Sequence, residues 1–95
     1  MFLVILTYKK PIADIEKALS DHVLFLDNYY EREKIIFSGR RNPRTGGVIL
    51  INSNDKEEVL DIIQQDPFYK DGLADYEIIE FTPTKYDERF RQFLS

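Results

Sequence analysis

The only histidine of the chain, His22, is the residue best suited to acid/base chemistry. An imidazole has an ordinary pKa of about 6.5, so it exchanges protons around neutral pH. On a helical wheel at about 100° per residue, His22 falls inside an arc of apolar side chains. The members of that arc are Ile12, Ile15, Leu19, Val23, Leu26, Tyr29 and Tyr30. The imidazole is therefore expected to point toward the sheet.

Asp66 is the candidate partner of this histidine. It continues the spacing of Val59 and Ile63 by one further turn of a predicted helix, so it belongs to the inward-facing stripe of that helix. At the C-terminal end of a helix, the dipole destabilises a carboxylate by a few tenths to about 1 kcal/mol unless a donor or cation compensates. We expect the two inward polar residues to meet, with Asp66 holding His22 in one tautomer.

Each residue of this pair also has a simpler interpretation. A lone histidine on an apolar stripe is more often a core residue bonded to a carbonyl or a tyrosine, and aspartate before proline is common in turns. Two hypotheses therefore stay open. One is an enzyme that uses His22 and Asp66 for isomerisation or elimination on a small cyclic or aromatic molecule. The other is a non-catalytic small-molecule-binding or assembly module with a structural pair.

Three further residues, Ser38, Arg40 and Tyr69, are candidates for contact with a bound substrate. Arg40 belongs to a basic cluster with Arg41 and Arg44 that could clamp an anionic group, although a solvated basic turn is the commoner outcome. Tyr69 could donate a hydrogen bond or stack on a ring, although packing is commoner for a tyrosine. One histidine without cysteine cannot form a closed zinc site, and the acidic residues lack calcium-loop spacing. We expect neither a metal nor a cofactor.

The elements that must position these residues follow the order strand, helix, strand, strand, helix, strand. The predicted strands are residues 2–8, 35–41, 48–52 and 76–82, and the predicted helices are residues 11–31 and 56–65, with a short docked helix within residues 86–94. The pair Gly46-Gly47 is expected in the turn between the second and third strands. This order predicts an α+β ferredoxin-like βαββαβ fold, a four-stranded antiparallel sheet with two helices on one face and with the first and third strands at the centre. Because the helices leave the other face of the sheet uncovered, we expect a homodimer joined through sheet faces.

Composition narrows the class of protein further. The 95 residues are expected to form a single domain, 1–95, and the absence of cysteine indicates a reducing, cytoplasmic location. The apolar N-terminal run is too short for a membrane span and lacks the features of a signal peptide. A net charge of −4 argues against a nucleic-acid partner. An RNA-recognition fold would also need stacking aromatic residues, which residues 48–51 do not offer.

The pattern resembles the YCII-related (YciI-like) family, small proteins of the dimeric α/β-barrel superfamily. The resemblance covers nearly the whole chain. It rests on a histidine with a leucine four residues on, a glycine ending the second strand, a DPF motif, a glycine-leucine pair and a tyrosine that leads the last strand. In this sequence these are His22 and Leu26, Gly39, Asp66-Pro67-Phe68, Gly72-Leu73 and Tyr76.

The resemblance implies a ferredoxin-like subunit in a dimeric α/β barrel, and it carries the role of an active-site pair to His22 and Asp66. The wider superfamily includes muconolactone isomerases and small oxygenases, and some YCII-like domains are linked to chloride removal from ring substrates. Residues 38–41 read Ser-Gly-Arg-Arg, whereas many relatives have glycine-proline or glycine-alanine there. The rim of the pocket therefore departs from the family pattern, and the resemblance does not indicate the substrate.

Overall fold

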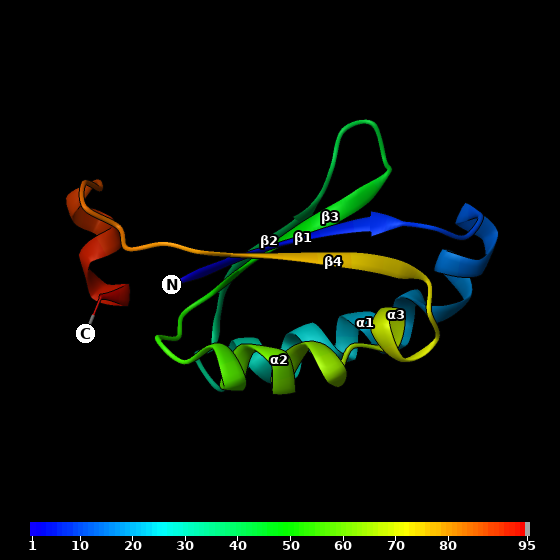
Figure 1. Cartoon of the computed structure of the whole chain (residues 1–95), viewed down its shortest axis with the longest axis horizontal. Coiled ribbons are helices and arrows are strands. Elements are labelled where there is room, and N and C mark those ends of the chain that lie inside the picture. Colours follow the sequence, from blue (N-terminus) through cyan, green and yellow to red (C-terminus); the bar gives the residue numbers. More distant parts are fainter. Residues whose placement is uncertain (95) are drawn as a thin grey trace.

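The computed structural model describes residues 1–94 and confirms the predicted α+β ferredoxin-like fold (Figure 1). Its elements are β1 (Phe2–Tyr8), α1 (Ile12–Glu31), β2 (Ile35–Arg40), β3 (Gly46–Ile51), α2 (Lys56–Gln64), α3 (Pro67–Lys70), β4 (Ala74–Glu80) and the 3₁₀ helix η1 (Glu88–Phe93). The strands pair antiparallel in the order β2-β3-β1-β4, so β1 and β3 are central as expected. No helix described within residues 1–94 is long and apolar enough to cross a membrane.

The two faces of the sheet differ because successive strand residues point to opposite sides. Phe2, Val4 and Leu6 of β1 are buried on the face covered by α1, α2 and α3, which lie on one side of the sheet in Figure 1. On the opposite face one cross-strand row joins Phe37, Leu50, Leu3 and Ile79. At the two ends of this row, Phe37 is 50% and Ile79 41% exposed. This face therefore keeps apolar side chains in contact with solvent.

Helix α1 buries a narrower stripe than the sequence predicted. Its buried side chains are Ile15, Ala18, Phe25 and Tyr29, and His22 continues their spacing at the centre. The predicted set of inward-facing residues was wrong for four of its members, and it left out one buried residue. Ile12, Leu19, Val23 and Tyr30 are exposed, and Phe25 belongs to the core. The helix is turned so that two of these exposed residues, Leu19 and Val23, border a cavity.

The boundaries of several elements also differ from those predicted. Gly46 and Gly47 lie in β3 rather than in the turn. A Cβ on Gly46 would lie 1.8 Å from the Leu6 carbonyl oxygen, so close strand approach requires this glycine. β4 begins at Ala74, two residues before the predicted start, because Ala74 pairs with Tyr8. The C-terminal helix is short, and none of its residues is buried.

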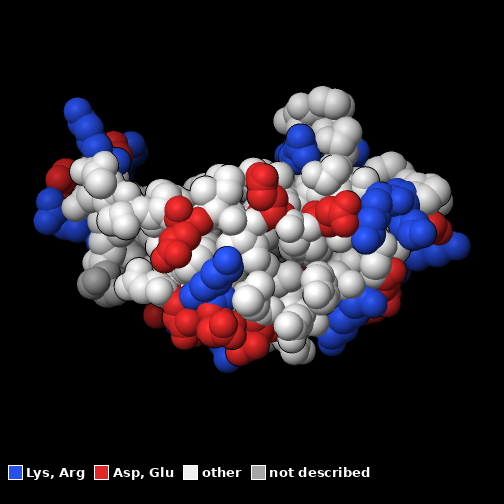
Figure 2. Space-filling model, in the orientation of Figure 1, with Lys and Arg blue, Asp and Glu red and all other residues white. Residues whose placement is uncertain are grey.

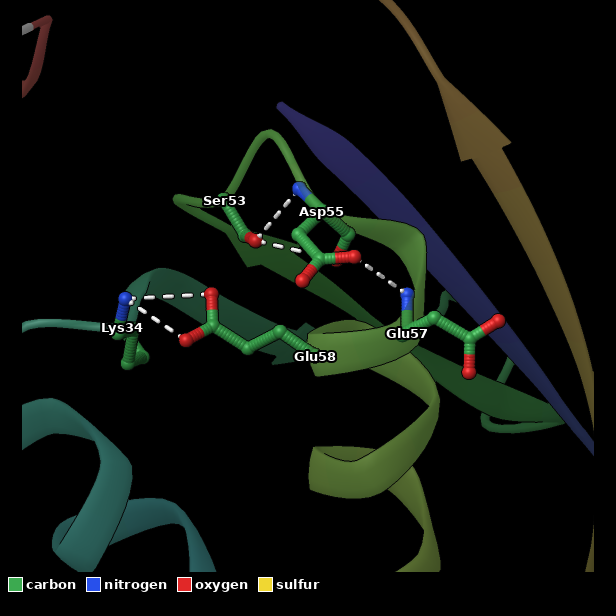
Figure 3. Close-up of polar contacts among 5 residues, drawn as sticks. All are labelled: Lys34, Ser53, Asp55, Glu57 and Glu58. Carbon is green, nitrogen blue, oxygen red and sulfur yellow. Dashed lines mark hydrogen bonds and ion pairs between the residues drawn. The ribbon is translucent and has the colours of Figure 1, made fainter.

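Helix α2 begins at an N-cap aspartate, Asp55. The Asp55 carboxylate accepts a hydrogen bond from the Glu57 N–H at 3.0 Å (Figure 3). The Ser53 hydroxyl oxygen accepts from the Asp55 N–H, also at 3.0 Å. Beside this cap, Lys34 and Glu58 form an ion pair at 3.0 Å. This cluster anchors the start of α2 at its junction with β3.

Candidate active site

The single-turn helix α3 positions the first residue of the site. Asp66 is its N-cap, and the Asp66 carboxylate accepts a hydrogen bond from the Phe68 N–H at 3.0 Å. Pro67 occupies the first turn, where the missing N–H costs nothing. At the other end Gly72 has φ +64°, and the Leu73 N–H donates to the Phe68 carbonyl at 2.9 Å. These two caps explain why a DPF motif and a glycine-leucine pair enclose one helical turn.

The structure corrects the predicted setting of Asp66. The sequence placed this carboxylate at the C-terminal end of the helix before it, where the dipole is unfavourable. Instead α2 ends at Gln64, and Asp66 begins a new helix. Its carboxylate therefore faces free N–H groups rather than carbonyls, which stabilises the negative charge.

His22 and Asp66 meet as the sequence predicted. His22 Nδ1 lies 2.8 Å from Asp66 Oδ1, and their side chains are 12% and 0% exposed. An ionised carboxylate can only accept hydrogen bonds, so Nδ1 carries the proton and Nε2 keeps its lone pair in the neutral ring. Within residues 1–94, Nε2 has no hydrogen bond, and no buried side-chain nitrogen or oxygen lacks a partner. Nε2 is therefore open to solvent.

Tyr76 is a third donor to the same carboxylate, and the sequence did not identify it in this role. Its hydroxyl donates to Asp66 Oδ2 at 2.5 Å from the helix-facing side of β4. Burial, followed by the negative charge of Asp66, raises the pKa of Tyr76 far above its ordinary value. The tyrosine thus remains a neutral donor. Tyr76 and Ile78 are two residues apart in a strand, so the sequence places both side chains on the same face of the sheet. Only the tertiary structure brings the Tyr76 hydroxyl to Asp66.

Phe68 fixes the plane of the imidazole. The two rings stack with centroids 4.0 Å apart and an interplanar angle of 5°. Phe68 is itself buried and packs edge-on against Tyr8. The same residue therefore supplies the N–H that holds Asp66 and the ring that supports His22. A positive charge on the imidazole would lie over an aromatic face, where it is attracted by the ring quadrupole.

A cavity of about 250 Å³ opens beside His22. It lies between α1, α3 and the ends of β1, β2 and β3. In Figure 1, α1 and α3 lie below the sheet, and the β2–β3 turn projects above it. Most of its lining is apolar, and its polar side chains come from His22, Tyr8, Ser38, Arg40 and Arg44. Asp66 does not line it. His22 can therefore touch a molecule in the cavity, whereas Asp66 can influence such a molecule only through His22.

Two of the three predicted substrate contacts lie in this cavity. Ser38 and Arg40 line it from β2, and Ser38 Oγ lies 2.6 Å from the hydroxyl of Tyr30 on α1. Tyr69 does not line it. The Tyr69 ring packs edge-on against Tyr76, with centroids 5.6 Å apart, and is about half exposed. The described part of the chain brings no three histidine, cysteine or acidic side chains together as metal ligands.

Comparison with known proteins agrees with this architecture. The model of the YCII-related domain matches residues 1–82. The chain belongs to this family. No curated protein matches the chain. Among solved structures, it is similar to 5-chloro-2-hydroxyhydroquinone dehydrochlorinase (TftG) from Burkholderia phenoliruptrix AC1100 in complex with 2,5-dihydroxybenzoquinone. The TM-score is 0.71 at 19% identity, covering 86% of this chain and 94% of that one. This likeness shows a shared fold.

Proposed function

We propose that this YCII-family chain is an acid/base enzyme in which His22 transfers the proton and Asp66 positions His22. The observation that carries the proposal is the asymmetry of the pair. His22 contacts both the buried carboxylate, at 2.8 Å, and the cavity, whereas the Asp66 side chain is fully buried. A general base needs one nitrogen held and the other free, and this arrangement provides both.

The proposed reaction begins with transfer of a proton from the substrate to Nε2. In an isomerisation, Nε2 returns this proton to a different atom of the same molecule. In an elimination, the electron pair left on the substrate expels a leaving group, and Nε2 releases its proton to water. The imidazolium formed in between is stabilised by the Asp66 carboxylate and the Phe68 ring. Proton transfer of this kind contributes roughly 10² to 10⁴ in rate.

The size and lining of the cavity favour a small cyclic or aromatic substrate. An apolar cavity of roughly 150 Å³ admits benzene, so about 250 Å³ suits a ring with a few substituents. The structural neighbour TftG acts on a chlorinated hydroxyhydroquinone, as its name states. Substituted hydroquinones and hydroxyquinones are therefore the first compounds to test.

We further propose that two copies of the chain associate through their open sheet faces. The apolar row of Phe37, Leu50, Leu3 and Ile79 supports this, because burying the exposed ends of the row would remove apolar surface from water. Sedimentation at micromolar concentration should show a dimer. Replacing Ile79 by lysine should shift it to monomer, and a wild-type monomer would contradict the proposal.

Turnover by His22 variants tests the enzymatic role. Chloride release from 5-chloro-2-hydroxyhydroquinone and absorbance changes of a panel of hydroxyquinones would be followed for wild type, His22→Asn and His22→Leu. We expect the wild type to convert at least one compound and both variants to lose 10² to 10⁴ in kcat. Wild-type rates in His22→Asn would contradict the role of His22. If no compound is converted, and folded His22→Leu binds them as the wild type does, the pair is structural.

A further inference from the structure

Three residues that line the cavity, Arg40, Gly47 and Leu6, belong to a row that crosses the sheet and ends at Tyr76. The register places Arg40 beside Gly47, Gly47 beside Leu6, and Leu6 beside Tyr76. Three strand spacings of about 4.8 Å separate the ends of this row by roughly 14 Å. Tyr76 holds Asp66 at one end, and Arg40 stands at the other. Gly47 has no side chain, so the row is open between Leu6 and Arg40.

The arginines that line this cavity are not balanced by any carboxylate among the described residues of its lining. Its lining contains Arg40 and Arg44 and no carboxylate within the described chain, although the whole protein has a net charge of −4. In Figure 2, basic side chains flank the projecting β2–β3 turn, whereas acidic ones gather over the start of α2. A cavity with this lining attracts anions despite the acidic protein around it.

The three arginines near this turn have different partners. Arg41 donates to Thr7 Oγ1 at 3.1 Å, and Arg44 forms an ion pair with Glu16 of α1 at 3.1 Å. Arg40 has no side-chain hydrogen bond or ion pair within residues 1–94. A guanidinium offers a planar fork that matches a carboxylate or another delocalised oxyanion. Arg40 thus presents this fork to the cavity without a competing partner.

We propose that the molecule bound here is a planar ring with one acidic group, a ring carboxylate or an ionised ring hydroxyl, and that Arg40 binds that group. Glu16 then sets the selectivity for charge, because it occupies Arg44 and limits the cavity to one uncompensated cation. This rests on the proposed function of the same cavity. To that function the inference adds the charge of the substrate and two residues, Arg40 and Glu16, that determine which charge the cavity binds.

Equilibrium binding measured by calorimetry at pH 7.5 tests the proposal with three probes. 2-Hydroxy-1,4-benzoquinone presents one ionised ring hydroxyl, 4-hydroxybenzoate presents one carboxylate, and 4-hydroxybenzamide is the neutral match of the benzoate. We expect one or both anions to bind and the amide to bind at least tenfold more weakly. The preferred anion identifies which acidic group the cavity takes.

Charge-matched variants locate the binding. Arg40→Gln should weaken anion binding at least tenfold, whereas Arg41→Gln, which removes the same charge outside the cavity lining, should change it less than twofold. Glu16→Gln should tighten anion binding by about two- to fivefold, because Arg44 is released. The control Asp27→Asn lies on the same helix, away from the cavity, and should leave binding unchanged.

Three results would overturn the inference: no anion binds, the amide binds as well as the anions, or Arg40→Gln and Arg41→Gln act alike. The outcome is separable from the proposed reaction. Anion binding should persist in His22→Asn, since binding needs no proton transfer. Loss of turnover in His22→Asn without any effect of Arg40→Gln on binding would leave the reaction standing and reject the anion site.

Discussion

Asp55 and Asp66 begin consecutive helices with the same local geometry but lie in different surroundings. Each carboxylate accepts the N–H two residues on at 3.0 Å. Asp55 is exposed, and its side chain serves only the helix start (Figure 3). Asp66 is fully buried and also accepts from His22 and Tyr76. The comparison shows that a helix cap becomes part of a site when the fold brings further donors to its unused lone pairs.

The largest difference is expected when each carboxylate is removed. Asp66→Ala leaves the His22 ring nitrogen, the Phe68 N–H and the Tyr76 hydroxyl without their acceptor, so the free energy of unfolding should fall by about 4 kcal/mol. Asp55→Ala should cost about 1 kcal/mol, the usual value for a cap. Urea denaturation followed by circular dichroism measures both. Equal losses would mean that the buried contacts of Asp66 add no stability.

A smaller loss is expected when only one donor to Asp66 is removed. Tyr76→Phe deletes the hydroxyl and keeps the ring, so the free energy of unfolding at pH 7 should fall by about 2 kcal/mol, the value for a hydrogen bond to a charged group. Tyr69→Phe is the matched control, because this neighbouring tyrosine is about half exposed and its hydroxyl forms no hydrogen bond within residues 1–94. If both variants denature at the same urea concentration, the Tyr76 contact is energetically neutral.

Alkaline pH tests the same contact in the wild-type protein. Because the pKa of Tyr76 is raised in the folded state, the folded protein keeps this proton at a pH where the unfolded chain loses it. Its contribution is therefore nearly complete below about pH 10 and declines above it, by about 1.4 kcal/mol at pH 11. Urea midpoints at pH 8 and pH 11 measure this. Tyr76→Phe should decline less than wild type by this amount, and equal declines would contradict the assignment.

The smallest effect is expected beside Asp55. Hydrogen bonds from Ser53 and then Lys34 lower the pKa of Glu58, so its contribution is present above the ordinary value of 4.5 and is lost as pH falls below it. Solvent screens this partly exposed pair, so Glu58→Gln should cost at most about 0.5 kcal/mol at pH 7 and less at pH 3. Thermal melts at both pH values measure it. A loss above 1.5 kcal/mol would show that the ion pair in Figure 3 is more than a surface contact.

The sequence by itself determined the order of elements, the central position of β1 and β3, and the pairing of His22 with Asp66. Periodicity reveals these because helices and strands bury residues at fixed intervals. The residue types DPF and glycine-leucine also determine a capped single turn, although the spacing of Val59, Ile63 and Asp66 suggested one further turn of the preceding helix. Pro67 and Gly72 carried that information locally, through their restricted and permissive backbones.

Only the tertiary structure decided the rest of the site. The Tyr76 hydroxyl reaches Asp66 from ten residues away, and Phe68 stacks on His22 across 46 positions of sequence. The rotation of α1 moved Leu19 and Val23 from the expected core to a cavity wall. Such contacts depend on how α1, α3 and β4 pack, and packing is set by the shapes of many side chains together. The spacing of apolar residues within a single helix or strand does not contain that information.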